Sequence, residues 1–138
     1  GVGAAGMSPY EDLIIDHWRH PRNKGTLPDP DVDVTEANVP CGDVVRLQLK
    51  VRNGKVEDVR FDGRGCAISM ASASLLTEML KGKRLEELEK MHQEEFLEAL
   101  GGVIKPRLNC ALLPFRTLRK ALKALGETGS RVDPPSYR

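Results

Sequence analysis

Residues 45–52 alternate strictly between apolar and polar side chains, and Asn53-Gly54 follows them directly. A period of two is typical of a strand with one buried face, and Asn-Gly is the strongest two-residue signal for a β-hairpin. The return strand carries its first two valines three positions apart, which is out of phase for a strand. We therefore predict a hairpin whose second strand has a bulge near Glu57 and Asp58.

Helix signals lie on both sides of this hairpin, so the chain combines a small sheet with helices. The expected elements are a helix that starts at Ser8-Pro9-Tyr10-Glu11, a weak strand around 32–36, a helix from 67 to Gly82, short helices within 84–91 and 93–102, and a final helix from near Pro114 to Gly126. These elements predict an α+β domain in which helices cover one face of an antiparallel sheet of about three strands.

The length and composition bound the class of protein. A chain of 138 residues is long enough for one core, and we assign the domain to residues 8–126. Residues 1–7 are interpreted as a cloning remnant, and residues 127–138 are expected to be a disordered tail.

The 21 basic and 20 acidic side chains nearly balance, which argues against a nucleic-acid partner. The lack of a long apolar run or a signal peptide argues against a membrane partner and favours the cytoplasm.

Three cysteines lie at the edges of the predicted elements. Cys41 lies in a Pro-Gly turn, Cys66 at a helix start, and Cys110 in or just before the first turn of the last helix. A helix N-terminus favours the thiolate form, which metal binding and sulfur transfer both require. Asp43, two residues after Cys41, would point the same way at the start of an extended segment. The four side chains match a tetrahedral zinc or iron site, but without paired CxxC spacing three separate buried thiols remain the alternative.

Three segments resemble a known family along most of the chain. They read "PCGD" at 40–43, "GRGCAISMASASLLTEMLKGK" from Gly63 and "RLNCALLPFRTLRKAL" from Arg107. Together with "HPRNKG" at 20–25, they closely resemble the IscU/NifU N-terminal family of iron-sulfur cluster assembly scaffolds, and most of all its SufU subgroup. The resemblance implies the IscU/SufE-like fold. It also implies that Cys41, Asp43, Cys66 and Cys110 bind the metal or cluster.

The resemblance further implies a function. A cysteine desulfurase would deliver sulfur, an iron donor would supply iron, and a transient [2Fe-2S] cluster would be built and passed to apo-proteins. The alternative is a zinc-dependent sulfurtransferase partner of a desulfurase, with Zn²⁺ on the same residues in the isolated protein. A purely structural zinc site is a third reading, in which removal of the metal would unfold the domain. The resemblance to IscU implies that Cys110 is the first persulfide acceptor, and Cys41, as in SufU-type proteins, is the alternative. A non-enzymatic scaffold is the main reading, and sulfurtransferase activity remains the alternative.

The sequence departs from the family pattern near the third cysteine. Asn109 stands where IscU has a histidine that could be a fourth ligand, which shifts that role to Asp43. The segment "VIKPR" replaces the family's binding segment for a dedicated Hsp70-type chaperone, which argues against that partner. The chain also lacks the insertion typical of SufU-type proteins, so its subgroup stays open. Elsewhere, His17 and His20 are interpreted as packed or solvated residues rather than as ligands.

Overall fold

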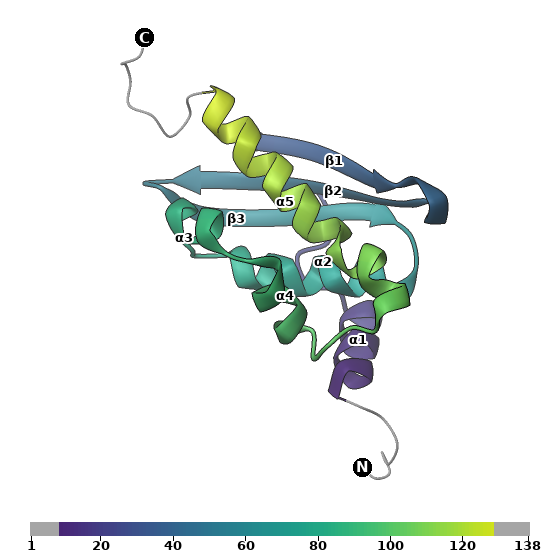
Figure 1. The fold of residues 1–138 in the computed structure, drawn as a ribbon. Coiled ribbons are helices and arrows are strands. Elements are labelled where there is room, and N and C mark those ends of the chain that lie inside the picture. The colour runs from purple at the N-terminus through teal and green to yellow at the C-terminus, as the bar shows by residue number, and fades with distance from the viewer. Residues whose placement is uncertain (1–8, 129–138) are drawn as a thin grey trace.

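The structure is a computed structural model that describes residues 9–128, and its α+β fold is built on a three-stranded antiparallel sheet (Figure 1). The strands, in sheet order, are β1 (Val32–Asn38), β2 (Asp43–Arg52) and β3 (Lys55–Arg64). The helices are α1 (Pro9–Arg19), α2 (Ala67–Leu80), α3 (Leu85–Lys90), α4 (Gln93–Ala99) and α5 (Leu108–Thr128), with 3-10 turns η1 (Val39–Cys41) and η2 (Lys105–Arg107). The predicted fold class is confirmed. Residues 127 and 128, predicted to belong to the tail, instead continue α5, so the last helix does not end at Gly126. The rest of the predicted tail, 129–138, and the predicted remnant at 1–7 lie outside the described residues.

The β2–β3 hairpin has the predicted turn and the predicted bulge. Asn53 and Gly54 both have positive φ angles, 55° and 76°, as a two-residue hairpin turn requires. Lys50 pairs with Asp58 whereas Val51 pairs with Val56, so Glu57 is the extra residue on β3. The bulge returns the two valines of β3 to one face of the sheet, where both are buried.

The core lies between the apolar face of the sheet and two helices, α2 and α5. Helix α5 packs over β1 and β2, and α2 packs against β3 (Figure 1). The buried side chains of the sheet are Val45, Leu47 and Leu49 from β2 and Val56, Val59 and Phe61 from β3. Each large apolar side chain of this kind contributes about 1.5–3 kcal/mol when it is fully buried. Because α2 also contacts α1, it is enclosed by packed elements, and its serines are buried together with Leu76 and Leu80.

The last helix begins earlier than the sequence predicts. Pro114 was expected to mark its start, but α5 begins at Leu108 and contains Pro114 in its interior. A proline has no N–H for the carbonyl four residues earlier, which here belongs to Cys110. The buried side chains of Leu113, Phe115 and Leu118 hold the helix in the core on both sides of the proline. Figure 1 shows the first turns of α5 off the straight axis of the rest, as expected for a proline kink.

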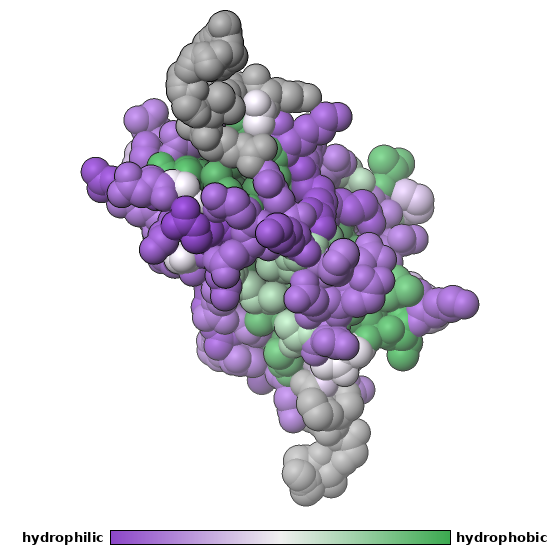
Figure 2. All heavy atoms as spheres, turned by 60° about the vertical axis from the view of Figure 1, so that its left-hand side comes forward, coloured by the Kyte–Doolittle hydropathy of each residue, from purple (hydrophilic) through white to green (hydrophobic). Residues whose placement is uncertain are grey.

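The face of the molecule drawn in Figure 2 is mainly hydrophilic. Figure 2 shows one face of the molecule, on which hydrophobic side chains gather in small, separate areas. Among residues 9–128, the large hydrophobic side chains that remain exposed are Trp18, Val39 and Ile104. None of the helices between residues 9 and 128 has the length and apolar character needed to cross a membrane.

Helix α1 is attached to α2 through a buried histidine. His17 is 5% exposed, and its Nδ1 lies 2.7 Å from the hydroxyl of Ser74, which also accepts a hydrogen bond from the backbone N–H of Arg22. Burial lowers the pKa of His17 below its ordinary value of 6.5, and Arg22 lowers it further, while Glu78 and Asp16 oppose the shift. His17 is therefore a packed residue, and His20, one residue beyond α1, is exposed.

The buried His17 predicts a stability that falls in mild acid. Because its pKa is lower in the folded chain than in the unfolded chain, the unfolded chain binds the proton more readily. The free energy of unfolding should therefore decrease as the pH drops below about 6.5. His17→Gln should flatten this dependence between pH 7.5 and 5.5, whereas His20→Gln on the exposed side should keep the parent slope. Urea unfolding at several pH values measures it, and equal slopes for the parent and both variants would contradict the assignment.

Candidate metal centre

The turn at residues 40–42 positions the thiol of Cys41 and the carboxylate of Asp43. It does so with a 3-10 turn followed by a left-handed glycine. Cys41 closes the 3-10 turn η1, and its side chain is exposed. Gly42 then adopts a left-handed conformation, with φ of 74°, and turns the chain into β2. Asp43, the first residue of β2, is only 1% exposed. The two side chains thus meet through a tight turn, and not through the extended alternation that the sequence suggested.

The carboxylate of Asp43 is buried because the glycine-rich end of β3 comes very close to it. Its Oδ1 accepts a hydrogen bond of 3.0 Å from the backbone N–H of Cys66. A Cβ atom at Gly65 would lie 2.4 Å from that Oδ1 and 2.7 Å from the hydroxyl of Ser69. A residue with a side chain therefore cannot replace Gly65 without displacing the carboxylate.

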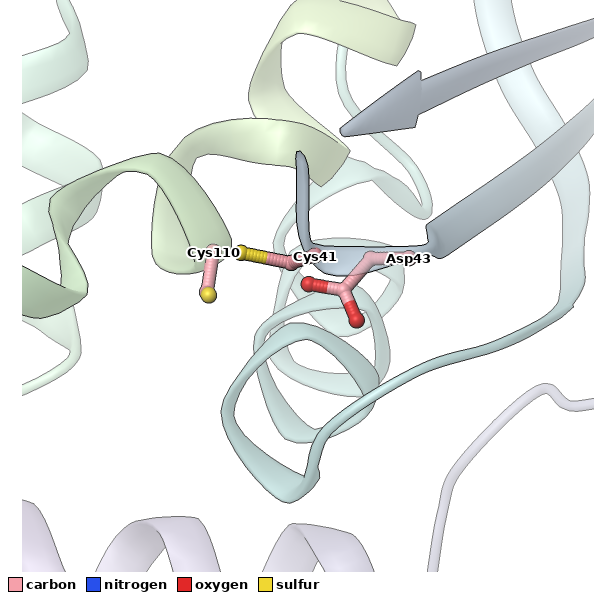
Figure 3. Close-up of side chains that lie close together, drawn as sticks. All are labelled: Cys41, Asp43 and Cys110. Carbon is pink, nitrogen blue, oxygen red and sulfur yellow. The ribbon is translucent and has the colours of Figure 1, made fainter. Parts of the chain in front are cut away.

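Three candidate ligand atoms converge in front of this carboxylate. The sulfurs of Cys41 and Cys110 and a carboxylate oxygen of Asp43 all lie within 4.8 Å of one another. In Figure 3 the side chain of Cys41 points toward Cys110, and one oxygen of Asp43 points toward the two cysteines. In a tetrahedral zinc site with Zn–S bonds of about 2.3 Å, ligand atoms lie roughly 3.8 Å apart. The three groups therefore fit a metal ion after a small inward movement, and the exposed Cys41 leaves one side open.

Cys66 lies beside these three residues, and its sulfur caps the start of a helix. It is the N-cap of α2, where its Sγ accepts from the backbone N–H of Ser69 at 3.5 Å. Its thiol also lies 3.9 Å from Oδ2 of Asp43, so it is next to the other candidate ligands without being one of the three that converge. The predicted helix-start position of Cys66 is confirmed, and its role as a ligand remains a prediction.

Cys110 is a protonated thiol in the metal-free site. Burial first, and then the neighbouring Cys66 and Asp43, together raise the pKa of Cys110 to about 12. The expectation that the start of the last helix would favour a thiolate at Cys110 is therefore wrong. Burial and acidic neighbours outweigh the partial charge of a helix end. A metal ion that binds this sulfur must displace its proton.

Tyr10 senses the charge of two of the cysteines and of Arg107. The phenol of Tyr10, from the first turn of α1, interacts electrostatically with Arg107, Cys66 and Cys110. Sequence reasoning used Tyr10 only as part of a helix start, because no spacing pattern connects it with cysteines so far along the chain. Asn109, next to Cys110, is exposed.

Comparison with known proteins agrees with the family resemblance of the sequence motifs, and the match covers the described chain. The model of the NifU-like N terminal domain matches residues 9–129. A structure of a nitrogen-fixing NifU-like protein (N-terminal) from Brucella abortus superposes with a TM-score of 0.73 at 23% identity, covering 86% of this chain and 94% of that one. At that identity the likeness concerns the fold.

Two curated relatives are similar over most of their length. The iron-sulfur cluster assembly scaffold protein IscU 1 of Archaeoglobus fulgidus is 37% identical over 124 residues, which cover 90% of this chain and 81% of the relative. The zinc-dependent sulfurtransferase SufU of Bacillus subtilis is 40% identical over 131 residues, which cover 82% of this chain and 88% of the relative. The names of these two relatives therefore correspond to the two functions that the sequence left open, a cluster assembly scaffold and a zinc-dependent sulfurtransferase.

The contact between Gly65 and Asp43 gives a test of the site. Gly65→Ala should push the carboxylate away from the two converging sulfurs and lower the affinity for Zn²⁺ roughly tenfold or more, as changes beside a metal ligand commonly do. Competition with a chromophoric chelator measures the affinity of the metal-free protein.

Gly25→Ala is the matched control for Gly65→Ala. Gly25 also has a positive φ, 140° against 157°, but a Cβ there meets nothing within 4 Å. This variant should bear similar backbone strain and retain the parent affinity for Zn²⁺. Equal affinities of the two variants would show that displacement of Asp43 is not the cause.

Proposed function

The chain belongs to the NifU-like N-terminal domain family, and from this premise we propose that it is an iron-sulfur cluster assembly scaffold. The observation that carries the proposal is the convergence of Cys41, Asp43 and Cys110, with Cys66 beside them, in a site open to solvent at Cys41. An exposed thiol at the opening lets a partner deliver sulfur. The more buried groups behind it can retain what is assembled.

We assign cluster or zinc binding to Cys41, Asp43, Cys66 and Cys110. Three thiolates and one carboxylate suit both a zinc ion and a transient [2Fe-2S] cluster. A carboxylate is a harder and weaker donor to cluster iron than a fourth thiolate would be. Asp43 therefore favours release of a finished cluster to an apo-protein, which a scaffold needs and a permanent iron-sulfur protein does not.

Sulfur delivery uses the difference in exposure between the cysteines. The thiolate of Cys41 attacks the outer sulfur of a persulfide on a cysteine desulfurase. The bond between the two desulfurase sulfurs breaks, the desulfurase leaves as a thiolate, and Cys41 carries the persulfide. We prefer Cys41 to Cys110 as first acceptor because Cys41 is exposed and Cys110 is buried. Each delivered sulfur must still gain two electrons to become a cluster sulfide, so a reductant and an iron donor also take part.

Two exposed apolar side chains support docking of a partner at this edge. Val39, 82% exposed, lies in the turn that carries Cys41, and Ile104, 64% exposed, immediately precedes η2, which leads into the helix of Cys110. Such side chains beside a reactive thiol suit a surface that a desulfurase covers. We place the reaction in the cytoplasm, where cysteine thiols stay reduced.

A zinc-dependent sulfurtransferase is the second candidate function. The SufU relative and the residue beside the third cysteine favour it, because the exposed Asn109 is a poor metal ligand. In this role Zn²⁺ occupies the same site, and one thiolate is freed to accept sulfur from the desulfurase. Sulfur then passes onwards without assembly of a cluster on this chain.

Anaerobic reconstitution distinguishes the two functions. Metal-free protein is mixed with a desulfurase, cysteine, a reductant and ferrous iron, and its visible spectrum is recorded. A scaffold should develop the absorption bands of a [2Fe-2S] cluster and then lose them to an apo-ferredoxin that gains them. Cys41→Ser, Cys66→Ser and Cys110→Ser should each reduce the bands strongly, whereas Asn109→Ala should retain them.

Other results would point away from the scaffold. Faster desulfurase turnover with zinc retained and no cluster bands would favour the sulfurtransferase. Unfolding of the domain on removal of zinc, with no effect on a desulfurase, would contradict both functions and indicate a structural zinc site.

A further inference from the structure

Two of the three converging groups are thiols. The sulfurs of Cys41 and Cys110 lie within 4.8 Å of each other, although the two cysteines are far apart in the chain. Figure 3 shows the side chain of Cys41 pointing toward Cys110. Because the sulfurs of a disulfide lie about 2.05 Å apart, an approach of at most about 3 Å separates this pair from a covalent bond.

The turn that carries Cys41 has room for this approach. None of the residues of η1 is buried, and the thiol of Cys41 is exposed. A Cβ atom added at Gly42 would meet nothing within 4 Å, so the space beside the turn is open. Cys110, by contrast, is held in the core by Ala111 and Leu113, which are fully buried in the same helix. We therefore expect Cys41 to move toward a fixed Cys110.

Exposure decides which cysteine meets an oxidant first. Cys41 is exposed, Cys66 has intermediate exposure, and Cys110 is buried. Because oxidation of a cysteine depends on its access to solvent, a peroxide reaches Cys41 before the others. Cys66 is not among the groups that converge with Cys41, and its sulfur accepts from the backbone N–H of Ser69. Cys110 is thus the thiol placed to react with an oxidised Cys41.

We propose that Cys41 and Cys110 form a reversible disulfide when the metal-free protein meets hydrogen peroxide. The sulfur of Cys41 attacks one peroxide oxygen, the O–O bond breaks, and the thiol proton leaves with the other oxygen as water. Cys41 is then a sulfenic acid. The sulfur of Cys110 attacks the sulfur of this acid, the S–O bond breaks, and the departing hydroxyl takes the proton of Cys110 as a second water. The two thiols together lose two electrons, which the peroxide gains.

The disulfide and a bound cation exclude each other. Metal binding requires thiolates, and a sulfur in a disulfide is no longer one. A cation in turn keeps both sulfurs in its coordination shell. The disulfide would therefore stop the site from loading under oxidising conditions, and a thiol reductant would reopen it. This consequence rests on the proposed function, whereas formation of the bond requires only the two thiols.

Peptide mapping by mass spectrometry tests the inference on the whole chain. Reduced, metal-free protein at low concentration is treated with a small excess of hydrogen peroxide, then unfolded and alkylated. The number of alkylated cysteines should fall from three to one, and the linked peptides should contain Cys41 and Cys110. Dithiothreitol should restore all three. Protein loaded with one equivalent of Zn²⁺ should keep three alkylated cysteines through the same treatment.

Two variants test the order of the steps. Cys66→Ser is the matched control, because it removes the thiol beside the site that the bond does not use. It should form the Cys41–Cys110 bond at the parent rate. Cys110→Ser should form no disulfide within the chain, and a dimedone reagent should trap the sulfenic acid at Cys41.

Several results would overturn the inference. These are a Cys66–Cys110 bond as the main product, disulfides only between chains, and sulfinic acid at Cys41 without a disulfide. Loss of the Cys41–Cys110 bond in Cys66→Ser would overturn it too. Rapid oxidation of protein that carries bound zinc would contradict the mutual exclusion. Formation of the disulfide in a protein that binds neither zinc nor a cluster would support the inference and overturn the proposed function alone.

Discussion

The hydrogen bond from the backbone N–H of Cys66 to the carboxylate of Asp43 is the interaction on which the site depends. It joins the start of β2 to the start of α2 and so brings two cysteine-bearing segments together. Gly65 makes the contact possible, because its missing side chain leaves room for the carboxylate. Asp43 is thus a structural anchor as well as a candidate ligand, and these two uses of one carboxylate explain its almost complete burial.

Convergence of acidic groups also explains the chemistry that we propose. A buried thiol next to another thiol and a carboxylate holds its proton, as the high pKa of Cys110 shows. A cation reverses this preference, since it stabilises all the negative charges together. The site is therefore arranged for an occupied state that differs from the metal-free one.

Local sequence patterns were sufficient to predict most of the fold. The hairpin, the bulge at Glu57 and the helix start at Cys66 follow from residues close together in the sequence, and the structure confirms them. The start of α5 could not be predicted, because packing in the core outweighs the local effect of Pro114. Likewise, sequence spacing alone does not bring Cys110 to the site. The family resemblance named the candidate ligands, whereas their burial and the role of the Gly65 contact required the structure.

The central claim is that Cys41, Asp43, Cys66 and Cys110 share one cation. X-ray absorption at the zinc edge, on protein loaded with one equivalent of Zn²⁺, tests it most directly. The account predicts about three sulfur neighbours near 2.3 Å and one oxygen neighbour at about 2.0–2.2 Å. A shell of nitrogen and oxygen atoms with at most one sulfur would contradict it, because the cysteines would then not meet around the metal.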